Sequence, residues 1–406
     1  MTSKQIKPLS LLLASAIFLA PLNLFIKWGE SQAYVGGIFS DYLVNKLWLA
    51  EIPVLLIAVW WLPKKIIANR QKIIQFAKKY WWLILGLLIF VARQFFSTLP
   101  TASWWQLLKV IELLIFAACL KEILPKVDRR LIEYVLLITV IFQFGVGLLQ
   151  FINQQPLFDY HILGETQFTG SINVAKASFT DGETSLAYGT TAHPNILAGV
   201  VTILGLLWLE IRLLANKKPQ WLELVVVAII AVTLFITQSY SALLATSLFL
   251  LIKTFPSVAK QPKPLAWSIG LLIPLLLIFL TTQTNDQSIF RRAFLNAHAV
   301  SLVAEQPLFG TGLNNFTTTL DQVTHPELVR FIQPAHNVFL LILAETGLLG
   351  LLLIWQALRA GRLIIPTAWL VLLITLLSLD HYLVTQWVGG VLLALAVIIN
   401  HRHQDQ

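Results

Sequence analysis

The stretch QPAHNVFLLILAETGLLGLLLIW, residues 333–355, decides the fold class. It opens on the polar residues PAHN and continues as an apolar run in which Glu345 is the one charged residue. A helix of about 20 apolar residues crosses the hydrocarbon core of a bilayer. The stretch therefore predicts a membrane span with His336 at its mouth.

Similar apolar runs recur along the whole chain. Of its 406 residues 57% are hydrophobic and 12% are charged, whereas soluble proteins carry about 25% charged residues. We predict an all-α polytopic membrane protein, one integral membrane domain over residues 1–406, with about twelve transmembrane helices. The predicted spans are 9–26, 43–62, 80–96, 103–120, 131–151, 191–211, 221–236, 239–252, 265–281, 336–358, 363–379 and 387–400.

The basic residues orient these spans. With the N-terminus in the cytoplasm, inner segments hold 21 of the 29 Lys and Arg residues, as the positive-inside rule requires. The net charge of +9 thus reflects membrane insertion and indicates no nucleic-acid partner. Both termini are expected inside. The long outer loops are 152–190 and 282–335, and the second has amphipathic helical spacing over 288–307.

Four cations depart from this charge rule and lie toward the outer leaflet: Arg93, Lys109, Arg291 and Arg292. Guanidinium groups bind phosphate oxygens in pairs, so these residues are candidates for binding a phosphate or diphosphate. There are structural alternatives. Lys109 and Glu112 share a helical face and could pair, Arg93 could reach the headgroups, and the Arg pair could rest on headgroups.

Histidine supplies a second candidate chemistry. Six of the eight histidines lie on the outer side, but only His193 and His336 open a predicted span beside Pro or Asn. Either could accept a proton from a sugar hydroxyl near neutral pH. We interpret the other outer histidines, His381 included, as ordinary loop residues. No histidine spacing is typical of a metal site, and Cys119 is the single cysteine, so no metal is expected.

Three segments resemble a known family. PLFGTGLNNF (307–316) followed by 333–355 is similar to the signature region of the O-antigen ligase and O-antigen polymerase superfamily. Arg292, fifteen positions before Pro307, and the segment YGTTAHPNILAG (188–199) extend the resemblance. It thus spans residues 188–355 and most of the predicted layout.

The resemblance implies a fold like that of the membrane type C glycosyltransferases, with a partly helical outer loop. It implies that a glycan leaves a polyprenyl diphosphate carrier for a lipid, glycan or protein hydroxyl, without metal or cofactor. The place would be the outer face of the bacterial cytoplasmic membrane, in lipopolysaccharide or other cell-envelope polysaccharide synthesis. His336 matches the histidine assigned to acceptor activation, and Arg292 matches the arginine that stabilises the diphosphate. Asn195 and Asn337 match pattern positions with structural roles.

One position departs from the family pattern. Many members carry Ser-Arg where this chain has TQSYSALLA (237–245), so Tyr240 replaces an expected phosphate ligand. A relative without activity therefore remains an alternative. A transporter or flippase is another, although the sequence shows no paired interrupted helices in two related halves. The residues do not distinguish ligase from polymerase, nor do they identify the sugar.

Overall fold

The computed structural model describes residues 3–168, 174–179, 182–215, 220–254, 286–322, 332–361 and 365–404. The structure is mostly helical (74%). Its α-helices are α1 (Ser3–Leu19), α2 (Glu51–Ala68), α3 (Arg70–Lys79), α4 (Trp81–Arg93), α5 (Pro100–Ile123), α6 (Arg129–Asn153), α7 (Tyr160–Leu163), α8 (Pro194–Ala215), α9 (Trp221–Thr237), α10 (Tyr240–Thr254), α12 (Asp286–Glu305), α14 (Val338–Gly361), α15 (Thr367–Leu379), α16 (Tyr382–Thr385) and α17 (Trp387–Gln404). Four 3-10 helices, η1 (Glu30–Gln32), η2 (Gln94–Phe96), η3 (Leu124–Lys126) and η4 (Phe316–Gln322), lie between them.

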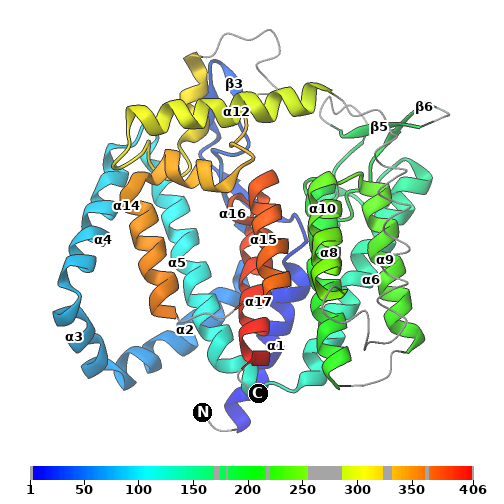
Figure 1. The fold of residues 1–406 in the computed structure, drawn as a ribbon, viewed down its shortest axis with the longest axis horizontal. Helices are drawn as coiled ribbons and strands as arrows, with labels where there is room; N and C mark the ends of the chain where they lie inside the picture. The colour runs from blue at the N-terminus through cyan, green and yellow to red at the C-terminus, as the bar shows by residue number, and fades with distance from the viewer. Residues whose placement is uncertain are drawn as a thin grey trace.

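Many of the helices run roughly side by side, and several of them pack on α8 (Figure 1). Helices α6, α9, α10 and α17 all contact α8. Of an apolar 18-residue stretch of α8, 78% is buried. Because α8 has apolar residues on all sides, it needs neighbours all round. The start of α1 and the end of α17 lie at one end of the bundle, and α12 lies at the other (Figure 1).

Helix α4 stands at the edge of the molecule and packs against α14. None of its residues is buried, and Leu85, Leu87, Leu88 and Ile89 are exposed. Such a surface would be costly in water but suits hydrocarbon. At the start of α4 the chain bends by 88° relative to α3.

The expected twelve spans are only partly seen. Within the described residues, three helices are long and apolar enough to cross a membrane: α6, α8 and α14. The bent pair α3–α4 makes a fourth if it is one span, and five further helices are apolar but shorter. The expected span 265–281 lies outside the described residues. The twelve-span layout therefore stays a prediction.

The end of the bundle near α12 contains structure that the all-α prediction did not include. Three antiparallel strand pairs form there: β1 (Phe25–Trp28) with β4 (Asn45–Trp48), β2 (Tyr34–Val35) with β3 (Ile38–Phe39), and β5 (Lys176–Phe179) with β6 (Gly182–Ser185). Short loops pair their own backbone in this way when no helix is available. Helix α12 lies across the same end of the helix bundle (Figure 1), where the helical spacing over 288–307 predicted a helix. Leu295 and Ala299 of α12 share a small core with Phe316 and Ala335.

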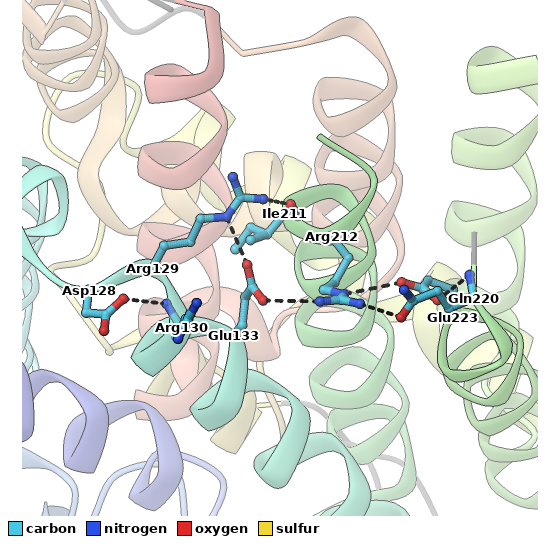
Figure 2. Close-up of polar contacts among 8 residues, drawn as sticks. All are labelled: Asp128, Arg129, Arg130, Glu133, Ile211, Arg212, Gln220 and Glu223. Atoms are coloured by element: carbon cyan, nitrogen blue, oxygen red, sulfur yellow. Dashed lines mark hydrogen bonds and ion pairs between the residues drawn. The ribbon is translucent and has the colours of Figure 1, made fainter. Parts of the chain in front are cut away.

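At the opposite end, charged side chains join α6, α8 and α9 (Figure 2). Glu133 accepts a 2.9 Å bond from Arg129 Nε and lies 3.7 Å from Arg212. Arg212 Nε also binds Glu223 at 3.2 Å, and Arg129 donates to the carbonyl of Ile211 near the end of α8. Cations near a helix C-terminus are favourable. The side chains of Arg129 and Arg212 are thus both paired within the protein.

Candidate functional site

The segment 307–316 docks onto a break in α14. At Gly347 the backbone leaves helical geometry, with φ 60° and ψ −165°. The backbone groups freed there bond to the segment: Thr311 N donates to Ala344 O at 2.9 Å, and Leu348 N donates to Pro307 O at 2.9 Å. Irregular backbone at membrane depth is tolerated where protein satisfies it, and this segment satisfies it.

Two glycines make this contact possible. A Cβ on Gly310 would lie 2.4 Å from the carbonyl carbon of Glu345, and one on Gly347 would lie 2.4 Å from that of Leu308. Both residues also have positive φ, which side-chain-bearing residues rarely adopt. The glycines of the motif are therefore needed because two backbones touch.

The same segment is also held by side chains. Glu345 accepts hydrogen bonds from Asn314 N at 2.9 Å and Phe316 N at 3.1 Å. Asn315 accepts from Leu99 N at 2.6 Å and donates to Ser103 Oγ at 2.7 Å. These bonds tie the segment to the turn before α5. Glu345 thus orients the loop within the structure.

His336 lies where this loop region meets the start of α14. Asn337 begins the helix, because its Oδ1 accepts from Leu340 N at 3.1 Å. This is an N-cap contact, so Asn337 acts structurally here. The His336 side chain is 9% exposed, and its Nδ1 is buried without a hydrogen-bond partner. Its ring centroid lies 5.1 Å from that of His381.

The other wall of the site comes from α8 and the turn after α15. His193 directly precedes α8, and its Nδ1 accepts from Asn195 N at 3.2 Å. Asn195 Nδ2 donates to Asp380 Oδ2 at 2.6 Å. Asp380 is 5% exposed and His381 6% exposed. Segments far apart in the sequence thus meet at one polar cluster.

Arg291 and Arg292 reach this cluster from α12. Both are half-buried, and their charges act on His193 and His336. Arg292 also acts on Asp380 and His381. The Nε atom of Arg292 is buried and has no hydrogen-bond partner. A cationic surface with an unused donor therefore faces the histidines.

Electrostatics set the charge state of this cluster. Burial, followed by the nearby charge of His381, lowers the pKa of His336 well below 6.5, so its imidazole is neutral at pH 7. Burial alone would raise the pKa of Asp380, but His381, His336 and Arg292 lower it overall. The cluster thus combines a neutral base, a carboxylate and two cations.

The remaining predicted residues lie elsewhere. Arg93 Nη2 donates to Gly310 O at 2.9 Å and so supports the loop. Lys109 pairs with Glu51 and lies 3.5 Å from Glu112, which favours the structural alternative. Tyr240 is the first residue of α10 and packs against the main core. A phosphate-binding role for these three residues is not supported by their placement and stays a prediction.

The loop–helix contact and two members of the polar cluster, Arg292 and His336, come from one part of the chain. Residues 225–355 match the O-antigen ligase family. This O-antigen ligase segment contains Arg292, His336 and the glycine contact, and it covers less than half of the 406 residues. No curated protein matches the chain. Together with its apolar helices, the O-antigen ligase match indicates a multi-pass membrane protein acting in glycan transfer on lipid-linked substrates.

Three residues of the cluster were not predicted as site residues, and all lie outside the O-antigen ligase segment. Asp380 and His381 form the dipeptide before the last helices, and Tyr42 lies 5.5 Å from His381, ring to ring. The adjacent Asp-His pair between two apolar runs was an available signal. Among the described residues, no group of three His, Cys, Asp or Glu is arranged to hold a metal ion.

Proposed function

We propose that the protein transfers a glycan from a polyprenyl diphosphate carrier to an acceptor hydroxyl at the outer face of the bacterial cytoplasmic membrane. The observation that carries this proposal is the convergence of His336 and Arg292 on one polar cluster. Burial and the O-antigen ligase match over both residues add support. The acceptor is a lipid, glycan or protein hydroxyl.

In the proposed reaction His336 is the general base. Its neutral imidazole takes the proton of the acceptor hydroxyl, and the oxygen attacks the anomeric carbon. The bond to the carrier breaks as its electrons move to the diphosphate oxygen. Attack opposite the leaving group inverts the configuration at that carbon.

Arg292 and Arg291 would stabilise the leaving diphosphate. Preorganised cations in a poorly hydrated site lower the barrier by about 3–4 kcal/mol per donor, and a positioned base contributes about 10²–10⁴-fold. Together these contributions make a metal unnecessary for the proposed step. His193 and Asn195 line the same cluster and are proposed to bind the substrate.

Two other functions remain as alternatives. A polymerase would use the same chemistry with a second glycan repeat as the acceptor, so the site does not separate it from a ligase. A transporter or flippase would move the lipid-linked glycan without breaking a bond. The neutral His336 favours the transfer reaction, because transport of the lipid-linked glycan needs no base.

The test is a reconstituted assay with purified protein in liposomes and a lipid-linked glycan. We expect Arg292→Ala to lower the rate of glycan consumption about 10²–10³-fold and His336→Ala about 10²–10⁴-fold. A matched control is Arg359→Ala, since Arg359 lies at the far end of α14 over Trp355. Wild-type rates in both site variants would rule out this mechanism, and transport without a glycan product would favour the transporter.

A further inference from the structure

His381 has two aromatic neighbours. Its ring lies 5.1 Å from that of His336 at an interplanar angle of 71°, and 5.5 Å from that of Tyr42 at 77°. Such near-perpendicular contacts are favourable between ring edges and faces. With 6% of its surface exposed, His381 is fixed by packing between these rings.

A hydroxyl group holds the Nδ1 edge of His381. Thr385 Oγ1 lies 2.7 Å from His381 Nδ1 and 3.1 Å from the His381 carbonyl oxygen. A hydroxyl group has one proton to donate and can accept from other partners. Thr385 therefore fixes the position of the His381 ring from the same turn of the chain.

Asp380 fixes the backbone at the same point. Its Oδ1 accepts from the backbone N–H of His381 at 2.8 Å, and its Oδ2 accepts from Asn195 at 2.6 Å. The turn that carries His381 is thus bonded to the start of α8. His381 is held by its ring contacts, by Thr385 and by its backbone.

We propose that His381 is a positioning residue for His336, holding that ring edge to face while Thr385 fixes the orientation of His381 itself. This inference rests on the proposed function. His336 has a buried Nδ1 with no hydrogen-bond partner, so no hydrogen bond of that atom orients its ring. Contact with a fixed neighbour supplies the orientation instead.

The charged groups around His336 predict the direction in which each substitution should change the pKa of His336. His381, Arg292 and Arg291 lower the pKa of His336, whereas Asp380 raises it. Removing His381 should therefore raise the pKa of the base, and removing the charge of Asp380 should lower it. A residue that only fills space would change neither.

The experiment measures kcat and KM against pH for glycan transfer by the full-length protein. In His381→Phe we expect kcat to fall by a larger factor than KM rises. The acidic limb of the pH profile, where activity falls as the pH is lowered, should move up by about one pH unit. In Asp380→Asn the limb should move down. Thr385→Val, which is nearly isosteric, should lower kcat, while Thr385→Ser should resemble the wild type.

His298→Phe is the matched control. His298 lies on α12 and has a comparable contact, its Nε2 being 2.8 Å from Thr319 Oγ1. The acidic limb should stay in place in this variant. An unmoved limb in both His381→Phe and Asp380→Asn, or an equal shift in His298→Phe, would overturn the positioning role. Absence of glycan transfer in the wild type would instead contradict the proposed function.

Discussion

Lys109 lies between two carboxylates, whereas Arg292 lies among histidines. Lys109 is 6% exposed, pairs with Glu51 and Glu112, and has its ammonium 4.3 Å from the centre of the Trp105 ring. Within the described part of the chain, Arg292 forms no ion pair, and its Nε has no hydrogen-bond partner. Both cations are at least partly buried.

The difference separates a structural cation from a binding cation. Burying a charge is costly unless the protein pairs it, so a cation with its own counterions stabilises the fold. A cation left without them gains when an anion arrives. The sequence alone could not make this distinction, because the partner of Lys109 is Glu51, on a different helix.

The largest effect should come from removing the paired cation. Lys109→Met would leave two carboxylates buried without a counterion, at a cost of about 3–5 kcal/mol in the free energy of unfolding. Thermal unfolding in detergent measures this loss. Arg359→Met is the control, and equal stability of both variants would contradict a structural role.

The next largest effect should come from binding of an anion, which should distinguish Arg292 from Lys109. At about 100 times its Kd, inorganic diphosphate should stabilise the wild type by about 2.7 kcal/mol. Arg292→Ala should lose this gain, because the unused donor is removed, whereas Lys109→Met should keep it. The same thermal shift in Arg292→Ala would place the anion elsewhere.

Acidic groups outnumber basic groups around Lys109, so removing one carboxylate charge there should have a smaller effect on stability. Glu51, Glu112 and Lys109 carry one more negative than positive charge when all are ionised, and one oxygen of each carboxylate is buried without a partner. Glu112→Gln should therefore change the unfolding free energy by less than about 1 kcal/mol. Glu51→Gln, which removes the nearer partner, should cost more, and the reverse order would refute this assignment.

The smallest expected effect concerns the pH at which the wild type loses activity on the acidic side. Because the pKa of His336 is lowered from 6.5, the base stays neutral as the pH falls toward and below that value. Activity is then lost only as the pH passes through the lowered pKa. The acidic limb of kcat/KM should lie below pH 6.5, and a limb at or above it would contradict a His336 that is neutral at pH 7.

Local sequence patterns predicted the parts of the site that depend on residues adjacent in the chain. Helical spacing predicted α12, and the PAHN tetrapeptide placed His336 at the opening of α14. The contact of Arg93 with Gly310 and that of His381 with His336 join residues far apart in the chain. Periodicity within one helix carries no information on such contacts, so the contact of His381 with His336 could not be predicted.

The strand pairs near α12 were missed for a related reason. Strands of two to four residues are too short to show alternation, and β1 pairs with β4 across an intervening hairpin. That intervening segment carries Tyr42 to His381. The sequence thus predicted the helices better than the segments that complete the site between them.

The break in α14 has a consequence for how the protein is made. A helix interrupted at Gly347 would enter lipid with unpaired backbone groups, each costing several kcal/mol. The segment that pairs them, 307–316, precedes α14 in the chain and is therefore synthesised first. The backbone groups at the break can therefore bond to 307–316 as α14 leaves the insertion machinery. The order of these segments in the sequence is thus also the order in which they can assemble.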